Sequence, residues 1–143
     1  MTTIDFYFNA ADRLQVACRL AGKALEQDKR VVIYAPQPEL AQRIDRLLWC
    51  WPAIAFVPHR MAHDALADET PVLIAAEAGA APAREVLLNL GTDCPESFER
   101  FERLLEIVSQ DDADRKAARA RYAWYRDRGY GIRNHDLAAA SGQ

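Results

Sequence analysis

The sequence predicts an α/β fold with three layers, α/β/α, in which helices cover both faces of a mostly parallel central sheet. The first reason is that segments typical of strands alternate with amphipathic segments typical of helices from the first residues onward. The second is that one strand segment is apolar throughout, as in strands buried on both faces of a parallel sheet. A chain of 143 residues can bury such a core as one unit. We therefore expect a single domain over residues 1–137 and a flexible tail over 138–143.

The first half of the chain is predicted to contain two pairs of a strand and a helix. Residues 3–8, TIDFYF, alternate apolar and polar side chains and are rich in residues that favour strands. Apolar residues then recur at helical spacing over 10–27, which predicts an amphipathic helix. The segment RVVIYAP, residues 30–36, is the short apolar run that predicts a buried strand closed by a proline. Residues 38–49 place leucines on one side and charges on the other, which predicts the second helix.

Three further strands are predicted in the middle of the chain. Residues 54–59, IAFVPH, form a short apolar run, and residues 70–77, TPVLIAAE, form another. The polar residues 60–69 lie between them as an excursion. The segment REVLLNLG, residues 84–91, predicts one more strand, which a glycine ends.

Two segments of the last third of the chain have features of helices. Residues 94–109, CPESFERFERLLEIVS, start like a helix with a proline and a glutamate in the first turn, although the apolar piece LLEIV is compatible with helix or strand. Residues 111–128 form the final helix, with aspartates near the N-terminus, where the helix dipole favours them. Gly129 stands where a glycine commonly ends a helix.

No motif for nucleotide or metal chemistry accompanies this fold prediction. The turns after the first two strand segments, NAADRL and PQPEL, lack the glycine patterns that let backbone amides approach a phosphate, which predicts a Rossmann-like arrangement without a phosphate loop. His59 and His63 stand four residues apart, but without the glutamate of a zinc-dependent hydrolase. Cys94 has no local feature of an activated thiol. We expect a non-catalytic protein without a cofactor or metal; a hydrolase built on Cys94 or His59 is the alternative.

The charge is distributed unevenly along the chain. The formal net charge is −3, from 18 basic and 21 acidic residues. Seven basic residues and one acidic residue lie between Arg115 and Arg133, so that this segment carries +6 and the rest of the chain −9. An acidic body repels a polyanion at long range, which favours a local acidic partner over broad nucleic-acid binding. No apolar run approaches the roughly 20 residues that span a bilayer, and the polar start is no signal peptide, so we expect a cytoplasmic protein with no membrane contact.

The basic segment places a tyrosine among arginines on one side of the last predicted helix. Intervals of three and four residues bring four side chains onto one stripe: Arg115, Arg119, Tyr122 and Arg126. One interpretation is an ordinary solvated basic face. Another is a site for an acidic peptide with a hydrophobic end, since guanidinium groups beside a ring can hold a carboxylate and an apolar side chain together. A third is direct single-strand binding, with nucleic-acid bases stacked on the rings of Tyr122, Trp124, Tyr125 and Tyr130.

A second group of aromatic residues follows the second predicted helix. The stretch LWCWPAIAFVPH, residues 48–59, contains Trp49, Trp51 and Phe56 together with two prolines. These rings either belong to the core, where aromatic side chains contribute much of the buried area, or form a surface that docks another protein. The sequence leaves both interpretations open.

Four segments together resemble one known family. They are DFYF (5–8), KRVVIYAP (29–36), LLW followed by WPAIAFVPH (47–59), and ARARYAWYRDRGY (118–130). In this order and spacing the chain resembles the chi subunit of bacterial DNA polymerase III holoenzyme. The resemblance implies an α/β/α fold without nucleotide chemistry, and an adaptor associated with the nucleoid and the replisome, whose contact with DNA is indirect. One surface of such an adaptor holds the acidic, phenylalanine-ended tail of the single-stranded-DNA-binding protein, and another holds the psi subunit of the clamp loader.

Carried over by this resemblance, the tail-binding site lies on the last helix and the turn after it: Arg119, Tyr122, Tyr125, Arg126, Gly129 and Tyr130. Arg119 and Arg126 would bind carboxylates of the tail, and Tyr122 would contact its terminal phenyl ring. Better-known members carry a lysine where this chain has Ala123. Arg121 or Arg126 would therefore have to supply the missing charge.

The surface for the psi subunit maps, by the same resemblance, to the aromatic and proline residues after the second helix: Trp49, Pro52, Phe56, Pro58 and His59. Because not every bacterium with a chi-like protein has a recognisable psi subunit, another replication or repair protein, such as a helicase, is the alternative partner for Trp49.

Overall fold

The central layer of the protein is a seven-stranded sheet. This computed structural model describes residues 2–50, 59–61, 71–77, 85–95 and 98–138. The strands are β1 (Thr3–Ala10), β2 (Val31–Tyr34), β3 (His59–Met61), β4 (Val72–Ala75), β5 (Val86–Asn89), β6 (Arg103–Ser109) and β7 (Ile132–Asp136). Their order is β3-β4-β2-β5-β6-β1-β7, and each of the described pairings is parallel. This confirms the predicted α/β class.

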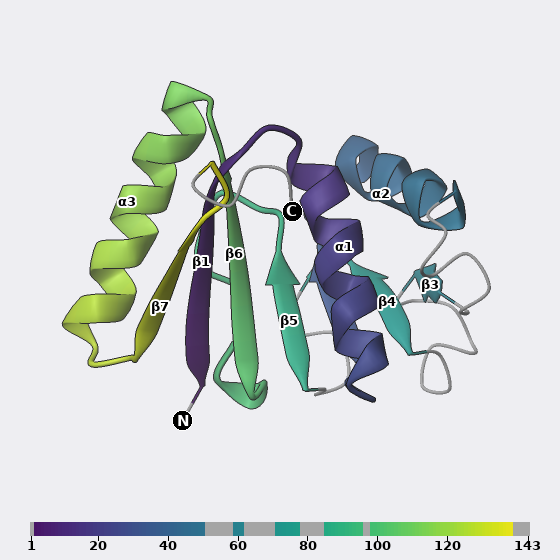
Figure 1. Cartoon of the computed structure of the whole chain (residues 1–143), viewed down its shortest axis with the longest axis horizontal. Helices are drawn as coiled ribbons and strands as arrows, with labels where there is room; N and C mark the ends of the chain where they lie inside the picture. The colour runs from purple at the N-terminus through teal and green to yellow at the C-terminus, as the bar shows by residue number, and fades with distance from the viewer. Residues whose placement is uncertain (1, 51–58, 62–70, 78–84, 96–97, 139–143) are drawn as a thin grey trace.

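Helices cover both faces of this sheet. They are α1 (Arg13–Glu26), α2 (Pro38–Cys50) and α3 (Asp112–Asp127). Successive residues of β2 point to opposite faces: Val31 and Ile33 pack in the cluster with α1 and α2, whereas Val32 packs in the cluster with α3. Figure 1 shows α3 on one side of β1 and β6, and α1 with α2 on the other. The structure therefore confirms the predicted α/β/α layers. Among the described residues, no helix is long and apolar enough to cross a lipid bilayer.

The ambiguous apolar part of the segment 94–109 is a strand. Among the described residues of its expected helical start, Phe98–Arg100 form a short 3₁₀ helix, and the segment LLEIV lies in β6. A strand between two parallel neighbours is buried on both faces and is therefore continuously apolar, which makes it resemble a buried helix in sequence. The other predicted segments match β1, β2, β4, β5 and the three helices within a few residues. Of the strand predicted over 54–59, residues 54–58 lie outside the described part of the chain, and β3 begins at His59.

The strand β7 has no counterpart among the predicted elements. Its sequence, IRNHD, is polar, and all of its residues are exposed or half-exposed. It pairs in parallel with β1, with Ile4 opposite Ile132, and ends the order of the described strands. Because an edge strand of this kind buries little apolar surface, hydrophobic periodicity gives almost no signal for it.

The end of α3 confirms the role expected for Gly129 and leads the chain into β7. Gly129 has a φ of 82°, in the left-handed region that favours glycine. Its N–H donates to the carbonyl of Arg126 at 3.0 Å, and the N–H of Tyr130 donates to the carbonyl of Tyr125 at 3.2 Å. These two bonds form a Schellman cap, which reverses the chain directly after the helix.

A buried carboxylate fixes β7 to the rest of the sheet. Asp5 of β1 is fully buried and pairs with Arg103 of β6 at 2.9 Å and with Arg133 of β7 at 2.8 Å. His135 of β7 lies 3.0 Å from the same carboxylate and stacks on the ring of Tyr7 with centroids 4.4 Å apart. Burial alone would raise the pKa of Asp5, but hydrogen bonds from His135, Arg133 and Arg103 hold it below its ordinary value of 3.8.

This arrangement predicts that Asp5 contributes to stability in a pH-dependent way. Because the folded state lowers its pKa, the contribution is present above the ordinary value of 3.8 and is lost as the pH falls through the lower folded pKa. Asp5→Asn is expected to reduce the free energy of unfolding by about 1–3 kcal/mol at pH 5. Urea unfolding of both proteins between pH 5 and pH 2.5 measures the difference, which should shrink as the solution becomes more acidic. A difference that stays constant over this range would contradict the pairing.

Candidate functional site

A pocket of about 260 Å³ opens between α3 and the carboxyl ends of β1 and β6. Its lining residues are Phe6, Phe8, Asn9, Val108, Arg115, Ala118, Arg119, Tyr122 and Asn134. The chain leaves β1 through α1 toward one face of the sheet, and leaves the neighbouring β6 through α3 toward the opposite face. Ligands of open parallel sheets commonly bind at such a topological switch point.

The inner wall of this pocket is apolar. Phe6 and Phe8 come from β1, where their spacing of two residues directs both side chains toward α3. Val108 of β6 and Ala118 of α3 extend the same surface. The ring of Tyr122 packs against Phe6 with centroids 5.1 Å apart. The pocket can therefore accept an apolar or aromatic side chain.

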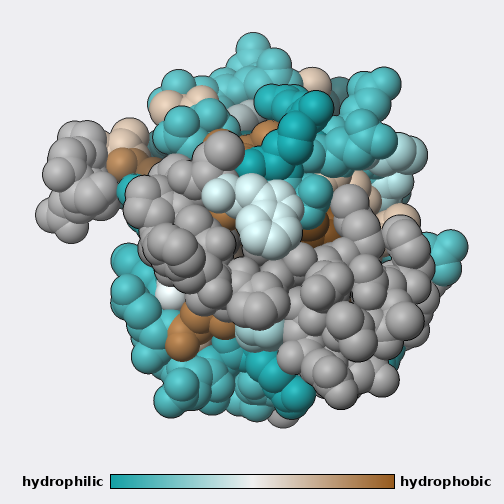
Figure 2. Space-filling view, turned by 90° about the vertical axis from the view of Figure 1, so that its right-hand side faces the viewer, coloured by the Kyte–Doolittle hydropathy of each residue, from teal (hydrophilic) through white to brown (hydrophobic). Residues whose placement is uncertain are grey.

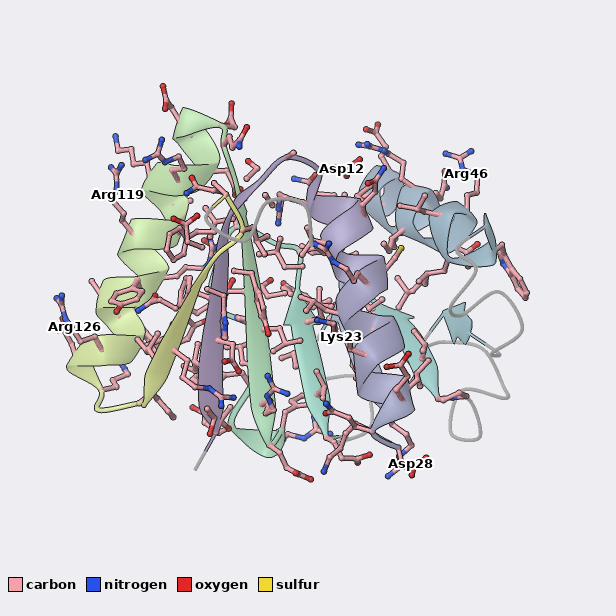
Figure 3. All side chains as sticks on the ribbon, in the orientation of Figure 1. Asp12, Lys23, Asp28, Arg46, Arg119 and Arg126 are labelled. Atoms are coloured by element: carbon pink, nitrogen blue, oxygen red, sulfur yellow. The ribbon has the colours of Figure 1, made fainter. Side chains whose placement is uncertain are left out.

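The rim of the pocket carries two cations and two amides. Arg115 and Arg119 are one turn apart on α3, and both side chains are exposed. Within the described ranges, neither guanidinium group makes a hydrogen bond or an ion pair. Figure 3 shows Arg119 projecting from α3 into solvent. Asn134 of β7 donates from Nδ2 to the hydroxyl oxygen of Tyr122 at 3.3 Å, and Asn9 completes the rim. Two unpaired cations above an apolar wall favour a ligand that combines carboxylates with an apolar group.

Three of the four residues predicted on one stripe line the pocket, and the fourth does not. Arg115, Arg119 and Tyr122 lie together as the helical spacing requires. Arg126 lies closer to the C-terminus of α3, outside the lining, and pairs with the adjacent Asp127 at 3.4 Å. Figure 3 shows Arg119 and Arg126 leaving α3 at different positions along the helix. Arg126 is therefore not part of this pocket, because two helical turns carry it past the end of the hollow.

Tyr125 is a core residue, which corrects its place among the predicted surface residues. Its side chain is 0% exposed, and its hydroxyl donates to Oε2 of Glu106 at 2.7 Å. It follows Tyr122 by three positions, which rotates it about 60° around the helix axis, from the rim of the pocket toward the sheet. Tyr130 also packs inward, with its ring 5.1 Å from that of Phe98, and Gly129 is an exposed turn residue outside the lining.

Arg121 cannot supply the positive charge of the lysine that better-known members of the family carry at the position of Ala123. It is 3% exposed, and its Nε donates to Oε1 of Glu106 at 3.1 Å while Nη1 donates to the carbonyl of Thr92 at 2.8 Å. The carboxylate of Glu106 also accepts from Asn89 at 3.0 Å. Burial raises the pKa of Glu106, and the nearby Arg121 opposes this effect. Arg121 thus holds a buried charge in place, and Arg126 is turned to Asp127, so the second cation of the pocket is Arg115.

The rings of α3 do not form an exposed row on which bases could stack. Trp124 packs edge-to-face on Phe98, with centroids 6.0 Å apart, and the guanidinium of Arg128 covers its ring at 3.7 Å. Tyr125 and Tyr130 pack on the same phenylalanine from other directions. This arrangement disfavours the interpretation as a stacking platform for single-stranded nucleic acid.

Sequence reasoning missed the half of the pocket that does not come from α3. The residues concerned are Phe6, Phe8, Asn9, Val108 and Asn134. The alternation within DFYF places Phe6 and Phe8 on one face of the first strand, which was an available signal. Nothing in the sequence indicates that α3 packs over that face, or that β7 supplies Asn134.

The second predicted surface is described only in part. Trp49 lies in the last turn of α2 and is 56% exposed. Among the described residues, no other large hydrophobic side chain is exposed. The exposure disfavours the core interpretation for this ring. Figure 2 shows this side of the molecule, where small hydrophobic patches lie among hydrophilic side chains. Pro52, Phe56 and Pro58 lie outside the described residues, and of His59 only the backbone position in β3 is described.

The fold and the pocket define a class: an α/β/α protein with a cationic, partly apolar pocket at a topological switch point. Comparison with known proteins specifies it further. Residues 1–133 match the family model for "DNA polymerase III chi subunit, HolC", and the chain therefore belongs to this family. The family assigns the chain to DNA replication, as an accessory subunit of the DNA polymerase III holoenzyme.

The relatives cover nearly the whole chain. A DNA polymerase III subunit chi of Pseudomonas aeruginosa is 36% identical over 141 residues, which are 96% of this chain and 98% of that protein. The subunit chi of Escherichia coli is 31% identical over 119 residues, which are 82% and 81% of the two chains. A chain in the solved structure of Saccharomyces cerevisiae dbp5 bound to nup159 and gle1 has a TM-score of 0.67 at 13% identity. It is matched over 94% of this chain but only 42% of its own length, and at this identity the likeness concerns the fold alone.

Proposed function

We propose that this protein is a replication adaptor that binds the acidic tail of the single-stranded-DNA-binding protein in the pocket between α3 and β1. The observation that carries the proposal is the pair of guanidinium groups of Arg115 and Arg119, which have no partner in the described part of the chain and lie at the rim of an apolar pocket. Membership of the chi family is consistent with such a role in replication.

Each part of the pocket matches one part of such a tail. The forked guanidinium groups of Arg115 and Arg119 would hold carboxylates of the tail by charge-assisted hydrogen bonds. The terminal aromatic side chain would enter the hollow beside the packed pair of Phe6 and Tyr122, where it can contact the faces and edges of these rings. Because the segment from Arg115 to Arg133 carries +6 on a body of −9, an acidic peptide would be drawn to α3 and repelled elsewhere.

The proposal predicts that Arg119 and Arg126 differ sharply in importance. Arg119→Ala is expected to weaken binding of a fluorescent acidic tail peptide about tenfold or more, because it removes charge-assisted hydrogen bonds in the pocket. Arg126→Ala is the matched control: it removes the same charge from the same helix, but outside the pocket and beside Asp127. It should change the dissociation constant by less than about threefold, through general electrostatics alone. Fluorescence anisotropy measures both. Equal losses for the two variants would contradict a site at Arg119.

A second surface, around Trp49, would link the tail-bound protein to the clamp loader through the psi subunit, or to another replication protein such as a helicase. The support is the exposure of a large aromatic ring at the end of α2, since such rings often dominate protein interfaces.

This second surface predicts a separation of functions. Trp49→Ala should weaken capture of the psi subunit, or of the helicase, about thirtyfold, as expected for a central aromatic residue. Its affinity for the tail peptide should be unchanged, because Trp49 does not line the pocket. Surface plasmon resonance with each partner in turn gives both values. Normal binding of both candidate partners by the variant would remove Trp49 from the proposal.

A further inference from the structure

We infer that the acidic tail binds in an extended conformation and pairs with the free edge of β7 as an additional strand of the sheet. This inference rests on the proposed function and adds the conformation and the main-chain partner of the ligand. Four features carry it: the open edge, the direction of its backbone groups, its proximity to the pocket, and its charge.

β7 is the last strand in the order of the described sheet and pairs only with β1 there. Figure 1 shows it between α3 and β1, at the margin of the strands. The other margin of the sheet, β3, is short and lies on the opposite side of the molecule from α3. The open edge next to the pocket is therefore that of β7.

The pairing with β1 determines which backbone groups of β7 point outward. The N–H of Ile4 donates to the carbonyl of Gly131 at 3.1 Å, and the N–H of Leu137 donates to the carbonyl of Phe8 at 3.0 Å. In a parallel pair these bonds involve every second residue of each strand, so the odd-numbered residues of β7 bond to β1. Ile132 and Asn134 consequently direct their N–H and C=O groups away from the sheet, where an added strand could bind them.

The same strand forms part of the pocket. The side chain of Asn134 lines the pocket and donates to the hydroxyl of Tyr122. The side chain of Ile132 is partly buried and packs against the core on the same face. A peptide whose last side chain enters the pocket past Asn134 would thus have its preceding main chain alongside the outward-facing groups of β7.

Charge selects an acidic occupant over a second copy of the protein. Arg133 of β7 is 58% exposed and shares the single carboxylate of Asp5 with Arg103, so that along the middle of β7 an exposed guanidinium group faces solvent, while the acidic Asp136 lies at the end of the strand. On the other side of β7, Arg119 and Arg126 of α3 are exposed. Two such cationic edges repel one another, which protects the edge from pairing with itself, whereas an acidic strand is attracted from both sides.

Hydrogen exchange of single amides tests this inference. The full-length protein is measured by NMR with and without a saturating acidic tail peptide. The outward amides of Ile132 and Asn134 should exchange about tenfold or more slowly in the complex, as expected for newly formed hydrogen bonds. The inward amides of Arg133 and His135 serve as controls within the same strand and should already be protected in the free protein. If the peptide binds with the expected affinity but both outward amides keep their rates, strand addition is wrong while the tail site stands. If no peptide binds, the proposed function fails as well.

A set of modified peptides gives an independent result. A methyl group on a backbone nitrogen removes one donor and prevents pairing at that position. Since donors of a strand alternate between its two sides, methylation at one set of alternate residues should weaken binding about tenfold, and methylation at the other set should have little effect. Equal effects at both sets would overturn the inference.

Discussion

Arg121→Met is expected to destabilise the protein by about 3–5 kcal/mol, because it leaves the carboxylate of Glu106 buried without its cation. Glu106 is a fully buried residue of β6, and its Oε1 lies 3.1 Å from Nε of Arg121 on α3. The hydroxyl of Tyr125 and the amide of Asn89 would still donate to it, but neither carries a charge. Urea unfolding at pH 7, followed by circular dichroism, gives the free energy of unfolding of both proteins.

Two further variants separate the charge from the packing of the side chain. Arg121→Met combined with Glu106→Gln removes both charges and should recover a substantial part of the loss, because Nη2 of Arg121 has no hydrogen-bond partner among the described residues and the pair is therefore incompletely satisfied. Arg126→Ala removes an exposed arginine from the same helix and should cost less than about 1 kcal/mol. A double variant as unstable as Arg121→Met alone would show that packing, not the unpaired charge, causes the effect.

Tyr122→Ala is expected to weaken binding of the acidic tail peptide about thirtyfold or more, which corresponds to a central aromatic residue of an interface. The substitution removes the ring that packs on Phe6 and thereby one wall of the pocket. Tyr122→Phe retains this ring and loses only the hydrogen bond from Asn134, so its affinity should stay within about threefold of the unmodified protein. Isothermal titration calorimetry provides the dissociation constants.

A control for folding belongs to this prediction, because Tyr122 also packs against the core. The thermal unfolding of Tyr122→Ala shows whether the variant is folded at the temperature of the titration. A folded Tyr122→Ala protein that binds the peptide as tightly as the unmodified protein would exclude the pocket as the site of the terminal aromatic side chain.

The layers of the fold were predictable because they depend on hydrophobic patterns that the sequence displays directly. The buried strand around Val32 and the amphipathic helix with Leu14 and Ala17 have the periodicities that their positions in the core require. β6 was ambiguous for a physical reason: its burial on both faces removes the alternation that distinguishes a strand. β7 was not predictable, since the ion pairs of Asp5 with Arg133 hold it in place and such long-range pairs leave no local pattern.

The pocket was predictable on one side only. Helical spacing placed Arg115, Arg119 and Tyr122 together, because these residues belong to one regular element. Helical spacing alone does not show which neighbours of the stripe face the sheet, and the family resemblance implied surface roles for Tyr125 and Arg121, although both side chains contact the buried Glu106. A row of side chains on one helix forms a pocket only when a second element packs opposite it. The packing of α3 against β1 is a feature of the tertiary structure, which helical spacing does not reveal.

The most direct test of the account locates the terminal aromatic ring of the tail in the complex. The measurement is a set of intermolecular nuclear Overhauser effects between a peptide with an isotope-labelled terminal phenylalanine and the full-length protein. The account predicts contacts from this ring to the side chains of Phe6, Phe8 and Val108, which form the apolar wall of the pocket. A saturated complex in which the ring contacts Trp49 or Trp124, and makes no contact with this apolar wall, would contradict the proposed tail site.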